Sequence, residues 1–110
     1  MLRGNLFETP AIAAQGELVQ QLADGGAFRL ERIVSAGHAT PPGEWYDQAQ
    51  DEWVVLLSGK AALLFEGESE VHRLQPGDYL LIPSRLRHRV EWTDATQPTV
   101  WLAIHFQDHR

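Results

Sequence analysis

The sequence contains no cysteine among its 110 residues. That absence excludes disulfide cross-links, thiolate metal sites and cysteine nucleophiles. It fits a reducing compartment. The first ten residues, MLRGNLFETP, show no long apolar segment and no small-residue cleavage site of a secretory signal. We therefore expect a cytoplasmic protein.

Long apolar runs and excess positive charge are also missing. No run approaches the roughly 20 residues that a membrane-spanning helix needs. The formal net charge is −6, which disfavours nucleic acid and anionic membranes as partners because both attract positive charge. We expect a small-molecule ligand, no nucleic-acid partner and no membrane partner.

The chain is instead rich in short apolar runs bounded by turns that contain glycine or proline, such as DGG, SGK and QPGD. Runs of this kind, rich in Val, Ile, Leu and aromatic residues, are typical of β-strands. We expect strands at residues 28–35, 53–58, 61–66, 71–74, 79–83, 88–92 and 99–106. The length suits one domain, residues 1–110. The pattern predicts an all-β fold, a small antiparallel β-barrel with its core at about residues 28–106.

The segment before the first of these strands is ambiguous. Residues 17–23, ELVQQLA, suit a short amphipathic helix or a strand. Asp24-Gly25-Gly26 follows, and this sequence favours a hairpin with residues 28–35. We predict the hairpin.

His88 is the most informative single residue. Alternate residues of a strand face opposite sides, so one face carries Arg87, Arg89 and Glu91. The other face carries His88, Val90 and Trp92. The charged face must contact solvent, and we therefore expect His88 to point into the core.

The strand around residues 53–58 is apolar on both faces. Glu52, Val54 and Leu56 share one face, and Trp53, Val55 and Leu57 share the other. A small barrel covers only its inner face, so an apolar outer face suggests a partner subunit. We expect a homodimer.

Two segments resemble the motifs of the cupin superfamily. In GDYLLIPSRLRH, Gly77, Pro83 and His88 match the second cupin motif, and Arg85 stands where cupins usually carry glycine. In DEWVVLLSG, Glu52 and Gly59 match the end of the first motif. The resemblance implies a double-stranded β-helix of the jelly-roll type, and it does not specify a reaction.

Cupins that bind a divalent metal use two further histidines, which are missing here. A four-residue gap before Glu52 places their positions at Trp45 and Asp47, and a three-residue gap places them at Tyr46 and Gln48. Asp47 could replace one histidine. The resemblance then implies a metal site of Asp47, Glu52 and His88 for a divalent ion such as Mn, Fe, Zn or Ni. The alternative is a site without metal.

Six further residues are candidates for ligand binding. Four of them would form aromatic walls or offer a hydrogen-bonding amide: Trp45, Tyr46, Gln48 and Trp92. His105 either reaches the interior or packs at a strand end or a dimer interface. Arg32 lies on the apolar face of its strand, so it either extends to the rim or pairs with a buried carboxylate such as Glu52 or Asp47.

These observations leave two functions open. The resemblance implies a divalent-metal-dependent enzyme acting on a small polar molecule, of the isomerase, epimerase or dioxygenase type. The alternative is a metal-free module that binds or senses a small molecule, with Glu52 and His88 as polar anchors. Whether the protein is an enzyme is undecided at this level.

Overall fold

The structure, a computed structural model, describes residues 1–107. Its strands are β1 (Glu17–Asp24), β2 (Phe28–Ser35), β3 (Asp51–Ser58), β4 (Ala61–Phe65), β5 (His72–Leu74), β6 (Tyr79–Ile82), β7 (His88–Thr93) and β8 (Thr99–Phe106). All regular elements in this part of the chain are strands, so the predicted all-β class is confirmed. No helix in residues 1–107 is long and apolar enough to cross a membrane.

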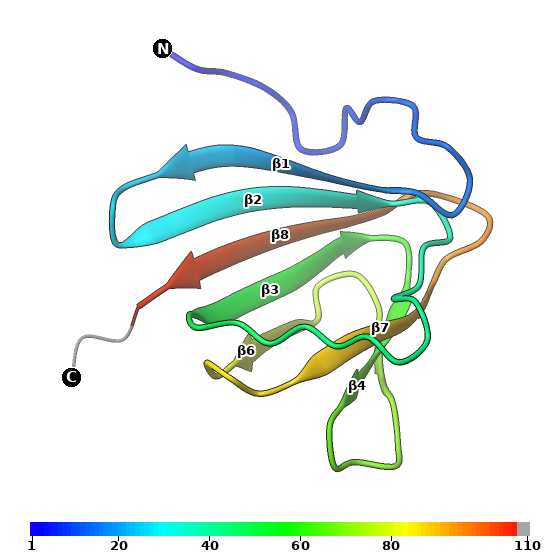
Figure 1. Cartoon of the computed structure of the whole chain (residues 1–110). Helices are drawn as coiled ribbons and strands as arrows, with labels where there is room; N and C mark the ends of the chain where they lie inside the picture. The colour runs from blue at the N-terminus through cyan, green and yellow to red at the C-terminus, as the bar shows by residue number, and fades with distance from the viewer. Residues whose placement is uncertain (108–110) are drawn as a thin grey trace.

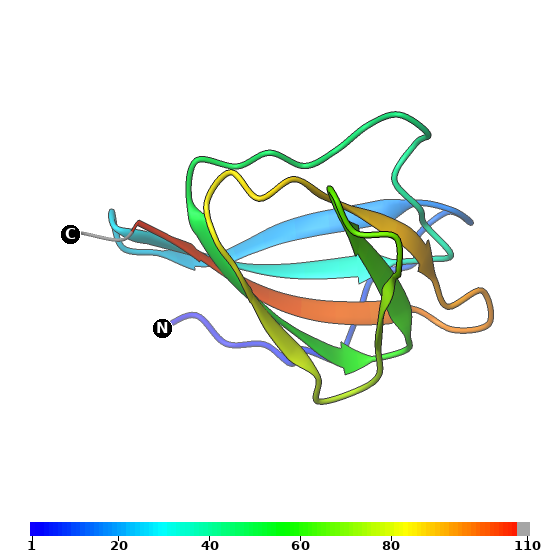
Figure 2. The same ribbon diagram turned by 90° about the horizontal axis from the view of Figure 1, so that it is seen from below.

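The strands form two antiparallel sheets (Figures 1 and 2). One has five strands in the order β1-β2-β8-β3-β6, and the other has three in the order β5-β4-β7. The barrel predicted from the sequence is therefore seen as two separate sheets whose inner faces enclose a common core.

The N-terminal hairpin is present. β1 pairs antiparallel with β2 from Glu17 opposite Ser35 to Asp24 opposite Arg29. Gly26 has a φ of 75°, a conformation that glycine adopts without steric cost. The prediction of a hairpin is confirmed, and the helical alternative for residues 17–23 is wrong.

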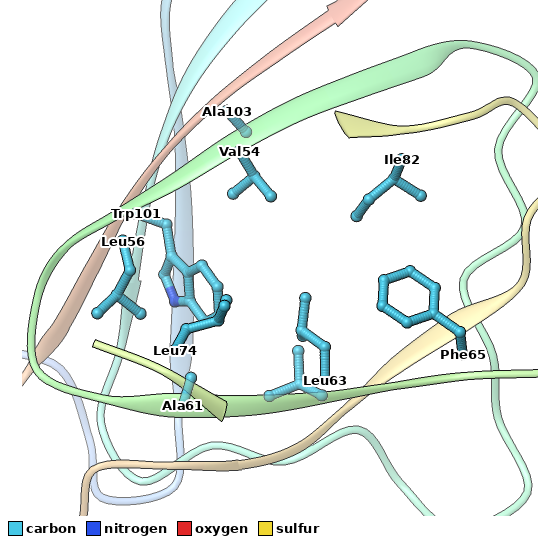
Figure 3. Packing of buried hydrophobic residues seen from close by; sticks show 10 residues of the cluster. Val54, Leu56, Ala61, Leu63, Phe65, Leu74, Ile82, Trp101 and Ala103 are labelled. Atoms are coloured by element: carbon cyan, nitrogen blue, oxygen red, sulfur yellow. The ribbon is translucent and has the colours of Figure 1, made fainter. Parts of the chain in front are cut away.

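The hydrophobic core lies between the sheets. In Figure 3, side chains from both sheets point into the same space. The five-stranded sheet contributes Val54, Leu56, Ile82, Trp101 and Ala103, and the other sheet contributes Ala61, Leu63, Phe65, Leu74 and Val90. Val54 and Leu56 share their face of β3 with buried Glu52. The core therefore continues directly into a polar region at one end of β3.

The alternation predicted for β7 fails after Val90. Ala62 and Leu63 of β4 are consecutive, yet they pair with Trp92 and Val90 of β7, so Glu91 is an extra residue. Such a β-bulge shifts the following side chains to the opposite face. Trp92 is 37% exposed while Thr93 is buried. The expectation that Trp92 shares the inner face with His88 is wrong.

Arg32 also lies on the face opposite to that expected. Its neighbours in β2, Glu31 and Ile33, line the space between the sheets. Arg32 is buried on the outer side, where its guanidinium donates to the Gln20 side chain and to the carbonyl oxygens of Asn5, Leu6 and Glu8. Arg32 therefore anchors the N-terminal segment, and it pairs with neither Glu52 nor Asp47.

Candidate functional site

A cavity of about 160 Å³ opens between the two sheets. Half of its lining is apolar and continuous with the core. The other half carries polar and ionisable side chains: Glu17, Arg29, Glu31, Tyr46, Gln48, Glu52, His88 and His105. A small cavity with an apolar floor and a few convergent polar groups is the usual form of a ligand site.

His88 lies at the start of β7 and is buried, as the sequence predicted. Its Nδ1 lies 3.0 Å from the carbonyl oxygen of Leu86. A carbonyl can only accept, so Nδ1 carries the proton and Nε2 keeps its lone pair. Burial lowers the pKa of His88, and the Leu86 carbonyl opposes this shift. His88 is therefore a neutral imidazole whose free nitrogen lies beside Glu52.

Glu52 lies at the start of β3, with its Oε1 3.7 Å from Nε2 of His88. This oxygen is buried and has no hydrogen-bond partner in the described part of the chain. Burial raises the pKa of Glu52 to about 7; the charge of Glu31 adds to the shift, and the charge of Arg29 opposes it. Near neutral pH the carboxyl is therefore divided between its acid and its base form.

His105 also lines the cavity, so of the two alternatives for this residue the structure shows the one that reaches the interior. It pairs with Glu52 across β8 and β3, and its Nε2 lies 3.0 Å from Oε1 of Glu31. Burial lowers the pKa of His105, and the carboxylate of Glu31 opposes that shift. Arg29 in turn donates from Nε to Oε2 of Glu31 at 3.0 Å. His105 is thus held in place through its Nε2, while its Nδ1 is buried without a partner.

The sequence pattern alone does not single out Glu31 and Arg29 as residues of the cavity. The apolar residues of β2 seemed to define its inner face, and the charged residues seemed to face solvent. The structure reverses this assignment because the N-terminal segment covers the other face around Arg32. A usable signal is the alternation of Arg29, Glu31 and Ile33, which places opposite charges on one face where they neutralise each other.

The structure decides between the two spacings of the first motif. Tyr46 exchanges two backbone hydrogen bonds with His88, of 2.7 and 3.1 Å, and its ring stacks on the imidazole with centroids 5.5 Å apart. Tyr46 and Gln48 line the cavity. The residues that face the cavity are therefore the pair that the three-residue gap selects.

Trp45 and Asp47 alternate with them and point away. Trp45 lies under the guanidinium groups of Arg87 and Arg89, each 5.9 Å from the ring centroid. Asp47 is exposed and forms an ion pair of 3.2 Å with Arg85. Neither residue lines the cavity, and Trp92 does not line it either. Of the predicted ligand-binding residues, the structure brings Tyr46, Gln48 and His105 together with Glu52 and His88.

The residues present fit the implied metal only in part. Glu52, His88 and the amide oxygen of Gln48 have suitable donor chemistry, but Asp47 is directed to Arg85 instead. Within residues 1–107 no three His, Asp or Glu side chains are placed so that they could hold a metal ion. The expected set of Asp47, Glu52 and His88 is not assembled.

Arg85 shows why this position usually carries glycine. Its φ is 66°, in the left-handed region that favours glycine. Its backbone N–H donates to the carbonyl oxygen of Gln48 at 2.7 Å. This bond and the ion pair to Asp47 connect the two motifs beside the cavity.

The fold and the two motifs define a class of protein. Residues 30–105 match the family described as Cupin domain, and the chain belongs to this family. No match was found among curated proteins.

The chain is similar to several solved structures. One from Ralstonia eutropha JMP134, provisionally described as a mannose-6-phosphate isomerase, is 45% identical, with a TM-score of 0.92 over 98% of this chain and 100% of that one. The polyketide cyclase RemF from Streptomyces resistomycificus is 19% identical, with a TM-score of 0.74 over 98% and 80% of the two chains. An RmlC-like cupin with a double-stranded β-helix fold from Methanocaldococcus jannaschii is 15% identical, with a TM-score of 0.69 over 90% and 87%. At these two lower identities the likeness concerns the fold alone.

Proposed function

We propose that this protein is an enzyme that moves a proton on a small polar molecule bound between the two sheets, with Glu52 and His88 as the acid–base pair. The observation that carries the proposal is the position of Oε1 of Glu52, 3.7 Å from the unprotonated Nε2 of His88, in a buried setting. A general base works best when its pKa lies near the working pH, and the pKa of Glu52 is raised to about 7.

The simplest reaction for this pair is isomerisation of a hydroxycarbonyl compound. The carboxylate of Glu52 takes the proton from the carbon that bears the hydroxyl group, and the electrons of the C–H bond form an enediol. The protonated Glu52, which can exchange its proton with solvent, then protonates the neighbouring carbon, while the carbonyl and hydroxyl groups exchange places. During this exchange, Nε2 of His88 takes the proton from the hydroxyl oxygen and passes it to the oxygen atom of the former carbonyl group, so that the ring ends neutral again. Atoms and electrons balance without another reactant.

The similarity to the Ralstonia eutropha structure supports this reaction type, because that protein is provisionally described as an isomerase of a sugar phosphate. The volume of the cavity suggests a smaller reacting unit. An apolar cavity of about 150 Å³ holds a molecule the size of benzene, and this cavity measures about 160 Å³. We therefore propose that a fragment of three or four carbons reacts inside it.

The test is exchange of carbon-bound hydrogen with solvent. Dihydroxyacetone, glyceraldehyde and hydroxyacetone are incubated in D2O with the protein, and deuterium incorporation is followed by NMR. We expect exchange above the buffer rate for at least one of them, and a loss of about 100-fold or more in Glu52→Gln, as for removal of a general base. Glu66→Gln is the matched control, because Glu66 is exposed and paired with Arg87. Equal rates in all variants and in buffer would overturn the proposal.

A second candidate is a metal-dependent enzyme. It is favoured by one observation, the buried oxygen atoms Oε1 of Gln48 and Oε1 of Glu52, which have no partner within residues 1–107. A cation near Nε2 of His88 would satisfy both. If this candidate holds, Mn, Fe, Zn or Ni added to chelator-treated protein raises the melting temperature, and His88→Ala abolishes the effect while His72→Ala does not. No shift with any of the four ions would exclude it.

A further inference from the structure

The unpartnered polar atoms of the cavity are of one kind. Among residues 1–107, four buried side-chain atoms lack a hydrogen bond, and three of them belong to residues that line the cavity: Oε1 of Gln48, Oε1 of Glu52 and Nδ1 of His105. His105 faces Glu31 through Nε2, which carries the proton when the ring is neutral, so Nδ1 is an acceptor. When the carboxyl of Glu52 is ionised, all three atoms are therefore acceptors. Buried acceptors are costly unless they are paired, so a ligand that stabilises this site must bring donors.

The charge of the lining favours the same kind of ligand. Glu17, Glu31 and Glu52 line the cavity, and among residues 1–107 Arg29 is the only lysine or arginine in its lining. The Nε of Arg29 is already bonded to Glu31. Three carboxyl groups therefore face one guanidinium group in the lining, and that guanidinium is engaged with one of them. An anion placed here would meet carboxylates at close range in a poorly screened site.

We propose that the cavity selects an uncharged or cationic ligand that carries hydroxyl or amino donors, and that it rejects carboxylates and phosphates. This inference rests on the proposed function in that it concerns the same cavity. The ligand class proposed here differs from the sugar phosphate that is named in the provisional description of the Ralstonia eutropha structure. If the natural ligand does carry an anionic group, that group must lie outside the cavity mouth.

Three probes of nearly equal size separate the alternatives. Serinol is a cation near neutral pH, glycerol is uncharged and glycerate is an anion, and all three have the three-carbon frame that suits a cavity of about 160 Å³. Binding is measured by NMR titration of ¹⁵N-labelled protein at about pH 8, where Glu52 is largely ionised. We expect serinol to bind best, glycerol less well, and glycerate at least ten times more weakly than serinol, with shifts confined to the cavity.

Two variants test whether the carboxylates cause the preference for a cation over an anion. Glu52→Gln and Glu17→Gln should each reduce the ratio of serinol to glycerate affinity several-fold with little effect on glycerol, whereas Glu66→Gln should leave the ratio unchanged. Glu17 keeps the test available if Glu52→Gln does not fold. Glycerate or inorganic phosphate binding in the cavity as tightly as serinol would overturn the inference, and so would the absence of serinol binding at millimolar concentration. If serinol binds but no substrate exchanges its carbon-bound hydrogen with solvent, the proposed reaction is wrong and the proposed ligand class is supported.

Discussion

Oε1 of Glu52 and Nε2 of His88 face each other across 3.7 Å, and more than nine-tenths of each side chain is buried. The distance is too long for a hydrogen bond, so each atom lies next to the other without satisfying it. Burial disfavours the charged form of both residues, which raises the pKa of Glu52 and lowers that of His88. At neutral pH, placing a charge on either group would therefore lower the stability of the folded protein.

The stability of the protein should depend on pH through Glu52. The pKa of Glu52 rises from 4.5 to about 7 on folding, so the folded state binds this proton more tightly than the unfolded state. The stabilisation is complete below about pH 4.5 and is lost as the pH rises to about 7. Each pKa unit corresponds to about 1.4 kcal/mol, so the loss is about 3 kcal/mol at most.

Comparison with Glu52→Gln isolates this effect from the titration of His88, which acts in the opposite direction as the pH falls below about 6.5. The free energy of unfolding of the variant relative to wild type, measured with urea, should increase by up to about 3 kcal/mol between pH 5 and pH 8. Glu66→Gln should show no such increase. A constant difference between wild type and Glu52→Gln across this range would contradict the prediction.

The charges of Glu31 and Arg29 should shift the pKa of Glu52 in opposite directions. Glu31 raises this pKa and Arg29 lowers it. Glu31→Gln is therefore expected to move the pKa of Glu52 towards its ordinary value, and Arg29→Gln to move it further upward. The measurement is an NMR titration of the side-chain carboxyl carbon. A shift in the same direction in both variants would show that distortion of the site, and not charge, controls Glu52.

Arg32 should hold the N-terminal segment against the outer face of the five-stranded sheet. Its Nη1 donates to the carbonyl oxygens of Asn5, Leu6 and Glu8 at 3.1, 3.3 and 2.9 Å. Arg32→Met removes these bonds and keeps the apolar stem, at an expected local cost of about 2 kcal/mol. Hydrogen exchange in peptides from residues 1–13 should accelerate roughly 30-fold, a factor that corresponds to this free energy. Arg3→Met is the control on an exposed arginine, and unchanged exchange in Arg32→Met would disprove the anchoring role.

The outer face of β3 and β6 should form a homodimer contact. Tyr79 and Leu81 are 64% and 60% exposed, and the Tyr79 ring packs on Trp53 with centroids 5.6 Å apart. β6 is also an edge strand of its sheet, and a second copy could pair with this edge while covering the apolar side chains. We expect light scattering at micromolar concentration to give a dimer mass, and Leu81→Glu to give a monomer. Leu2→Glu tests an exposed leucine elsewhere, and a monomeric wild type would exclude the contact.

The sequence predicted the strands because alternation and turns are local properties. It also placed His88 and Glu52 correctly, since both belong to motifs with fixed spacing. It misassigned Arg32 because the inner face of β2 is determined by what covers the outer face, and the N-terminal segment that covers it is distant in sequence. It left the choice between Asp47 and Gln48 open, because only the backbone pairing of Tyr46 with His88 fixes which residues of that segment point inward.

The extra residue Glu91 determines which residues of β7 face inward on either side of it. Before Glu91 in the chain, His88 and Val90 face the cavity and the core. After Glu91, Thr93 is the inward residue, and its hydroxyl donates to the carbonyl oxygen of His38 at 2.7 Å. The inward side chains before and after Glu91 therefore follow different alternations along the strand. Removing Glu91 would make the pairing of β4 with β7 continuous, and regular alternation would then leave Trp92 outward and Thr93 inward beside His38. The bulge thus lets β7 carry one more residue than β4 needs, while His88, Val90 and Thr93 all keep their inward side chains.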